Sequence, residues 1–110
     1  MRVAAIDIGT NSIHMLVVRV REDLSFEVID REKAMVRLGA GGLDGKALTA
    51  EAMNSALQAL AKFNRLAKAR QVDAVLAAAT SATREARNGG EFLARIEHGP
   101  DLGLHGEHVI

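Results

Sequence analysis

The chain has 110 residues, with 14 basic and 14 acidic side chains and a formal net charge of zero. Proteins that bind nucleic acid or anionic membranes normally carry a basic excess, so neither partner is predicted. The absence of cysteine excludes disulfides and zinc–thiolate sites in these residues and fits the cytoplasmic location that we expect. The longest apolar run near the N-terminus, Val3 to Ile6, is too short for a signal peptide or a membrane span.

Three strands are predicted in the first part of the chain. Residues Val3–Ile8 and Ile13–Val20 are apolar at both alternating sets of positions, so we expect central strands covered on both faces. The segment Phe26–Leu38 begins with alternating apolar and charged residues, which is typical of a half-exposed strand. Because short polar turns separate the segments, they should form an antiparallel meander.

A long helix should follow the glycine-rich loop that starts at Gly39. Thr49 is predicted to cap this helix, which should run to about Arg70. Its apolar side chains recur at helical spacing and predict a buried stripe. The stripe consists of Met53, Ala56, Leu57, Leu60, Phe63 and Ala67.

The remaining residues predict two more strands and a short helix. Val72–Ala79 reads as a fourth strand, followed by a polar segment and a break at Gly89 and Gly90. A short helix around Phe92 should end at Gly99 and Pro100, and His108–Ile110 should begin a fifth strand. The predicted fold class is therefore α/β in the order βββαβαβ, one lobe that stops within its fifth strand.

The turn after the first strand is a candidate phosphate site. Asp7 ends an apolar strand, and the small residues Gly9, Thr10, Asn11 and Ser12 come directly after it. Their backbone N–H groups and hydroxyls could surround a phosphate oxygen, and Asp7 could hold a metal ion directly or through water. An ordinary hairpin with Asx-type turns would have the same composition.

A second polar turn follows the fourth strand. Thr80 and Ser81 offer hydroxyl groups, and Arg84 offers bidentate donors one helical turn later. Ligands of open α/β sheets favour the carboxyl ends of strands, so both turns could share one site. Alternatively, Thr80 or Ser81 caps a helix while Arg84 and Arg87 lie on a solvated face.

The histidines carry less information. His105 and His108 would point to opposite faces of an extended segment, so a solvated loop is the better interpretation. His14 lies within an apolar strand and is interpreted as a core residue.

Three segments, in order, resemble the exopolyphosphatase/guanosine pentaphosphate phosphohydrolase (Ppx/GppA) family. The first is Ala4–Val17 (AAIDIGTNSIHMLV), which is similar to the opening signature of that family. The second combines Val36–Leu43 (VRLGAGGL) with Gly45–Leu48 (GKAL), and the third is Ala79–Asn88 (ATSATREARN). Because D-x-G-T-x-S also begins many sugar kinases, the specificity comes from the three segments together.

The resemblance implies an actin-like, ribonuclease H-like ATPase fold, of which residues 1–110 would form part of the first lobe. It also implies hydrolysis of the terminal phosphate of polyphosphate or guanosine pentaphosphate, with a divalent metal, expected to be Mg²⁺, and homodimeric full-length relatives. By this resemblance Gly9–Ser12 bind phosphate, Asp7 lies near the metal, and Arg84 contacts the transferred phosphoryl group.

The chain departs from the family pattern at its end. The glutamate expected to act as general base belongs to an I-S-G-x-E-E-A motif that would follow Ile110, and the second lobe is absent from these residues. The 110 residues alone are therefore expected to be inactive. Two alternatives stay open: an ATP-dependent kinase of the same superfamily, or a non-catalytic segment that binds phosphate or nucleotide.

Overall fold

A computed structural model describes residues 1–39, 47–79 and 81–98. The predicted strands and long helix are confirmed, whereas the predicted fifth strand and most of the glycine-rich loop lie outside the described residues. The elements are β1 (Arg2–Ile8), β2 (Ser12–Val20), β3 (Phe26–Met35), α1 (Ala50–Ala69), β4 (Ala74–Ala79), α2 (Ser81–Glu85) and α3 (Gly89–His98).

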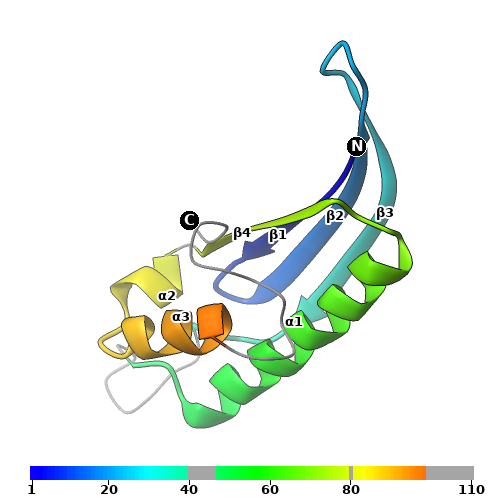
Figure 1. The fold of residues 1–110 in the computed structure, drawn as a ribbon. Coiled ribbons are helices and arrows are strands. Elements are labelled where there is room, and N and C mark those ends of the chain that lie inside the picture. The colour runs from blue at the N-terminus through cyan, green and yellow to red at the C-terminus, as the bar shows by residue number, and fades with distance from the viewer. Residues whose placement is uncertain (40–46, 80, 99–110) are drawn as a thin grey trace.

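The four strands form one sheet in the order β3-β2-β1-β4 (Figure 1). β2 pairs antiparallel with both β1 and β3, which confirms the predicted meander, and β4 pairs parallel with β1. β3 ends at Met35 rather than at Leu38. The reason is local: the N–H groups of Val36 and Arg37 both turn to the carbonyl oxygen of Asn11, at 3.0 Å each, and Arg37 adopts a positive φ of 49°.

The helix α1 begins and ends where the sequence predicted. The Oγ1 atom of Thr49 accepts a hydrogen bond from the N–H of Ala52 at 3.0 Å, and Arg70 forms the C-cap. Such a cap satisfies one of the otherwise unpaired N–H groups of the first turn. The residues of the predicted stripe are buried, except that Leu57 is half-buried, and Ala52 and Asn64 are buried beside them.

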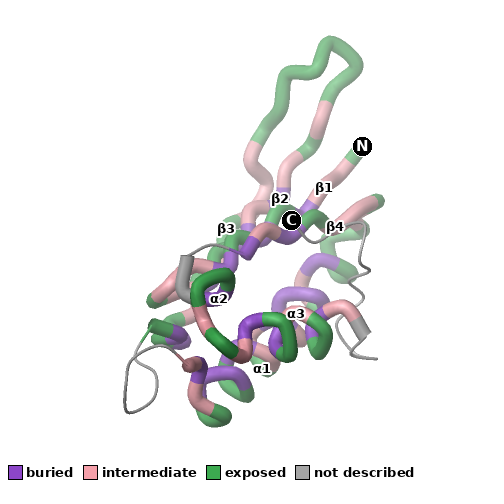
Figure 2. Tube along the Cα trace, turned by 90° about the vertical axis from the view of Figure 1, so that its left-hand side faces the viewer, coloured by how far each residue is buried: buried purple, intermediate pink, exposed green. Residues whose placement is uncertain are grey.

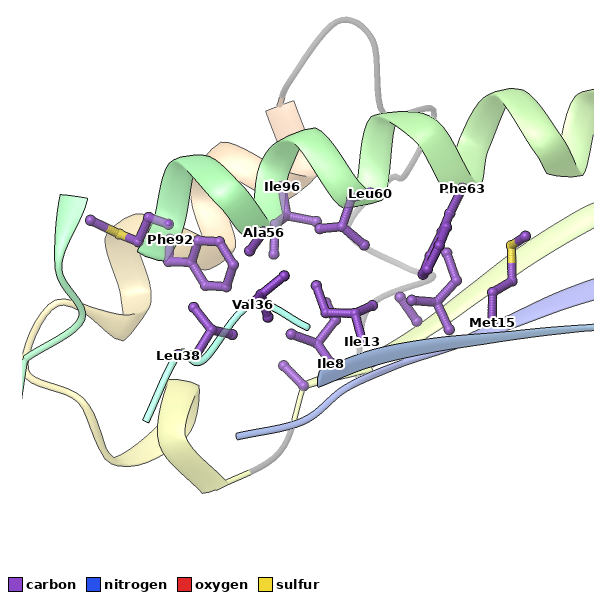
Figure 3. Packing of buried hydrophobic residues seen from close by; sticks show 14 of the residues in the cluster. Ile8, Ile13, Met15, Val36, Leu38, Ala56, Leu60, Phe63, Phe92 and Ile96 are labelled. Atoms are coloured by element: carbon purple, nitrogen blue, oxygen red, sulfur yellow. The ribbon is translucent and has the colours of Figure 1, made fainter. Parts of the chain in front are cut away.

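The core lies between α1 and one face of the sheet. Figure 3 shows side chains from β1 and β2 pointing toward α1, with Phe92 and Ile96 of α3 beside the beginning of the helix. Phe63 and Leu60 of α1 are almost fully buried in this cluster. From the sheet, Ala4, Ile6, Ile8, Ile13, Met15 and Val17 contribute to it.

The opposite face of the sheet is largely exposed, so the prediction that β1 and β2 are covered on both sides is wrong for the described residues. Successive side chains of a strand alternate between faces, and α1 covers only one of them. Ala5 and His14 are exposed on the other face, and Leu76 of β4 is 44% exposed. In Figure 2, buried segments gather on the helices and on the nearby part of the strands, whereas the far end of the β2–β3 hairpin is exposed or half-buried.

The segment after β4 also differs from the prediction. Gly89 and Gly90 do not interrupt the chain but begin α3, and the break falls at residues 86–88. Gly89 is needed there because a Cβ on it would overlap the carbonyl oxygen of Thr83. In the described residues, the order is therefore βββαβαα. No helix in these ranges is long and apolar enough to cross a membrane.

Candidate functional site

The two predicted polar turns leave the sheet at the same edge. β1 and β4 are parallel neighbours, and Ile8 and Ala79 are the last register partners of this pair. The turn 9–11 follows β1, and α2 begins at Ser81, two residues after β4 (Figure 1). The prediction that both turns leave the same sheet edge is therefore confirmed. Thr80 lies outside the described residues, as does the side chain of Ser81.

The turn after β1 is closed by the N–H of Gly9, which donates to the carbonyl oxygen of Ser12 at 3.0 Å. A Cβ on Gly9 would lie 3.0 Å from the same oxygen, so the turn has little room for a side chain there. The carbonyl oxygens of Thr10 and Asn11 accept hydrogen bonds from residues 36–39. Among the described residues, the N–H groups of Thr10 and Asn11 have no acceptor. The turn therefore leaves two N–H donors available to a ligand, while the carbonyl oxygens of the same two residues are already hydrogen-bonded.

Arg84 is held against the end of β4. Its Nε–H donates to the carbonyl oxygen of Ala79 at 2.7 Å, and its side chain is exposed. Within the described part of the chain, its two Nη groups have no acceptor. One edge of the planar guanidinium is therefore fixed by the protein, and the other donors are available to a phosphate.

Arg87 lies in a different setting. It is exposed, as predicted, but it belongs to the turn between α2 and α3 rather than to a helix. The polar sequence after β4 therefore places only one of its two arginines on the short helix next to the strand end.

Asp7 and His14 are register partners on β1 and β2, and both are exposed. The interpretation of His14 as a core residue is thus wrong, because only the neighbouring Ile13 and Met15 face α1. Instead, the Nε2 atom of His14 lies 2.9 Å from the Oγ atom of Ser12, a hydrogen bond whose direction depends on the tautomer. His14 thus belongs to the surroundings of the candidate site.

The exposed carboxylate of Asp7, beside the first turn, is a group that could help to hold a divalent metal, directly or through water. The described residues hold no group of three or more His, Cys, Asp or Glu side chains that could bind a metal by themselves. The carboxylate of Asp7 has no protein partner within these residues. A lone free carboxylate suits Mg²⁺, which keeps several water ligands and commonly adds oxygens from the substrate phosphate.

Sequence reasoning missed the contact between residues 36–39 and the first turn. The N–H of Gly39 donates to the carbonyl oxygen of Thr10 at 2.8 Å. A Cβ on Gly39 would overlap the Cγ2 atom of Thr10, so glycine allows the two backbones to approach. The sequence did contain one signal of a close contact, because Gly39 directly follows a predicted strand. The pattern does not show, however, which segment approaches this glycine.

Comparison with known proteins gives the family. A profile of the Ppx/GppA phosphatase family matches residues 16–103. The chain belongs to this family. The crystal structure of the Aquifex aeolicus Ppx/GppA family member is 30% identical, with a TM-score of 0.85, and the match covers 100% of this chain and 35% of that one. An exopolyphosphatase from Cytophaga hutchinsonii is 33% identical, with a TM-score of 0.85 and coverages of 99% and 33%.

The Ppx/GppA relatives also establish the fold. Their actin-like ATPase fold contains the arrangement of β1, β2, β3, α1 and β4 described above, as the sequence resemblance predicted. The chain spans about a third of the length of these relatives. RuvC of T. thermophilus matches with 18% identity and a TM-score of 0.56, a likeness that concerns the fold alone.

Proposed function

We propose that these residues form the phosphate-binding part of a phosphohydrolase that removes the terminal phosphate from inorganic polyphosphate or guanosine pentaphosphate. The observation that carries the proposal is the common edge at which β1 and β4 end, with free N–H donors after one strand and the Arg84 guanidinium after the other. Membership of the Ppx/GppA phosphatase family supports a phosphoanhydride as substrate.

Each part of the site has a role in this proposal. In the turn Gly9–Ser12, the free N–H groups of Thr10 and Asn11 hold a phosphate of the substrate, together with the hydroxyl groups of Thr80 and Ser81. Arg84 contacts the phosphoryl group that is transferred. Its fixed donors stabilise the charge on the equatorial oxygens, because they need no reorganisation during the reaction. Mg²⁺, when bound near Asp7, would neutralise further phosphate charge.

The reaction itself is a hydrolysis. The oxygen of a water molecule bonds to the terminal phosphorus, and the bridging P–O bond of the anhydride breaks. The shortened substrate departs with the bridging oxygen, and the terminal group is released as inorganic phosphate. A base must accept a proton from the attacking water or hold it in line. We assign that role to a carboxylate of the remaining two thirds of a family protein, since residues 1–110 span only about a third of the relatives.

The chain alone should therefore bind but not hydrolyse. General-base assistance is typically worth ~10²–10⁴-fold in rate, so its loss is enough to make turnover negligible. Titration calorimetry with tripolyphosphate and Mg²⁺ should detect weak binding to the 110-residue chain, while phosphate release stays at the background rate. Release at the rate of a full-length family enzyme would contradict the assignment of the base.

A chimera tests the activity directly. Residues 1–110 would replace the matching third of the Cytophaga hutchinsonii exopolyphosphatase, of which they cover 33%. We expect Mg²⁺-dependent release of phosphate from polyphosphate. A folded chimera that releases none, or that instead transfers phosphate from ATP to an added alcohol, would contradict the proposed function and favour the non-catalytic or kinase alternative.

A further inference from the structure

A pair of hydrogen bonds ties the turn between α2 and α3 to the start of α1. The Nδ2 atom of Asn88 donates to the carbonyl oxygen of Leu48 at 2.8 Å, and the Oδ1 atom of Asn88 accepts from the N–H of Leu48 at 2.8 Å. The two residues are 40 positions apart, and the contact is partly buried. A side-chain amide satisfies both backbone groups because it offers a donor and an acceptor together.

Asn88 itself is firmly placed by its neighbours. Its carbonyl oxygen accepts from the N–H of Phe92 at 3.3 Å, and Phe92 is fully buried in the core. Gly89, the next residue, lies so close to the carbonyl oxygen of Thr83 that no side chain fits. A shift of Asn88 relative to Leu48 would therefore be passed to Thr83 and to α2.

Arg84 is the residue after Thr83, and its Nε–H must reach the carbonyl oxygen of Ala79. α2 has only five residues, so it has little internal rigidity of its own. We propose that Asn88 is a positioning residue: by fixing α2 against the start of α1, it holds the Arg84 guanidinium at the end of β4. The inference rests on the proposed function only in that Arg84 serves to bind phosphate.

The substitution Asn88→Asp tests the inference, because its effect should be reversed by lowering the pH. At pH 7 the carboxylate still accepts from the N–H of Leu48 but repels its carbonyl oxygen. A protonated carboxyl group again offers one donor and one acceptor, so the contact should return at about pH 3.5, near the usual pKa of aspartic acid. Each measurement is compared with the unchanged chain at the same pH, because other carboxylates titrate in this range.

The first readout is the NMR signal of the Arg84 Nε–H group, assigned through the loss of the signal in Arg84→Lys. We expect Asn88→Asp to shift this signal at pH 7 and to restore it at low pH. The second readout is the affinity for tripolyphosphate at pH 7, which should fall about fivefold, as expected when one ordinary hydrogen bond is lost. Thermal unfolding is recorded for every variant.

Asn54→Ala is the matched control. Asn54 lies on α1 and accepts a hydrogen bond from Arg95 of α3 at 3.1 Å, so its removal loosens the same two helices without touching Asn88. We expect the control to leave the Arg84 signal and the affinity unchanged. If Asn88→Asp does not fold at pH 7, Asn88→Ser, which keeps one hydrogen-bonding group, replaces it.

Two results would overturn the inference. One is an unchanged Arg84 signal in a folded Asn88→Asp or Asn88→Ser variant. The other is a shifted signal that Asn54→Ala reproduces at equal loss of stability, which would make Asn88 an ordinary structural contact. If the unchanged chain does not bind tripolyphosphate, the proposed function fails, but the Arg84 signal still decides the role of Asn88.

Discussion

The Nε–H group of Arg84 is bonded to the carbonyl oxygen of Ala79, the last residue of β4, at 2.7 Å. This contact orients a guanidinium on an exposed residue, where long side chains are normally mobile. It leaves the two Nη groups without an acceptor among the described residues, at the end of the strand whose last register partner is Ile8 of β1. We therefore expect the proposed phosphate-binding role of Arg84 to depend on the planar fork of arginine and not on charge alone.

Arg84→Lys and Arg84→Ala should separate these two contributions in the chimeric enzyme. Lysine keeps the charge but loses both the fork and the Nε–H contact, so we expect kcat to fall more than substrate affinity. Alanine should have the larger effect, about 10²–10³-fold in kcat, as when one fixed donor to a transition state is removed. Steady-state phosphate release from polyphosphate provides both parameters.

Arg87→Ala is the control for this series. Arg87 is exposed and lies in the turn between α2 and α3, so its loss should leave kcat nearly unchanged. We also expect its effect on the free energy of unfolding to stay within about 0.5 kcal/mol, the usual range for exposed substitutions. Equal losses of activity for Arg84→Ala and Arg87→Ala would show that the site is assigned to the wrong arginine.

Much of the fold could be predicted because local patterns suffice for it. The N-cap at Thr49 and the buried stripe of α1 depend only on residue types at helical spacing. The common edge of the two polar turns follows from an apolar strand placed before each of them. The register of Ile8 with Ala79 confirms this expectation.

Other features depend on tertiary contacts that no local pattern reports. The amide of Asn88 could have bonded any exposed backbone, and its partner at Leu48 is known only once α1 and α3 are packed. The prediction that His14 lies in the core was wrong for a related reason. An apolar strand indicates burial, but the sequence does not show that the described helices leave one face of the sheet exposed.

Gly89→Ala and Gly90→Ala should have opposite effects on stability. A Cβ on Gly89 would overlap the backbone of Thr83, which cannot move without moving α2, so we expect a loss of about 1–3 kcal/mol. Gly90 has no atom within 4 Å of such a Cβ, and alanine is the better helix former by roughly 0.5–1 kcal/mol. Urea unfolding of both variants checks the pair. Similar losses of stability at both positions would mean that any substitution in the first turn of α3 is unfavourable, and that the contact with Thr83 is not the cause.

The turn between β2 and β3 should respond to pH through Asp23. The hydroxyl of Ser25 donates to Oδ1 of Asp23 at 2.6 Å, and the N–H of Ser25 donates to the same atom at 2.9 Å. These two bonds lower the pKa of Asp23 below its ordinary value of 3.8, and the bond from the hydroxyl has the larger effect. A lowered pKa means that the contact stabilises the turn above pH 3.8 and is lost as the pH falls through the folded-state value.

Ser25→Ala should therefore raise the pKa of Asp23 toward its ordinary value, because the main stabilising donor is removed while the N–H of residue 25 remains. The side-chain carboxyl ¹³C signal of Asp23, followed over pH, measures this change. Ser55→Ala, on the exposed side of α1, serves as the control and should leave the titration unaltered. A titration curve that does not move in Ser25→Ala would disprove the contact.

Gly39→Ala should disturb the first phosphate-binding turn from outside the turn. A Cβ on Gly39 would overlap the Cγ2 methyl of Thr10, whose carbonyl oxygen already accepts from the N–H of Gly39 at 2.8 Å. The backbone bond holds the two segments together, so the overlap is relieved at Thr10, by turning its side chain or by moving its backbone. We expect a loss of about 1–3 kcal/mol in the free energy of unfolding, together with shifted amide signals for Thr10 and Asn11.

The double variant Gly39→Ala/Thr10→Ser tests whether that methyl is the cause. Serine keeps the hydroxyl that could face a phosphate but lacks the Cγ2 atom, so the added Cβ should then fit. Most of the lost stability should return, and the two substitutions should be non-additive by more than about 0.5 kcal/mol, beyond the usual scatter for independent sites. Urea unfolding of both single variants and of the double variant gives the coupling. Additive losses would show that Gly39 is required for its own backbone conformation and not for its approach to Thr10.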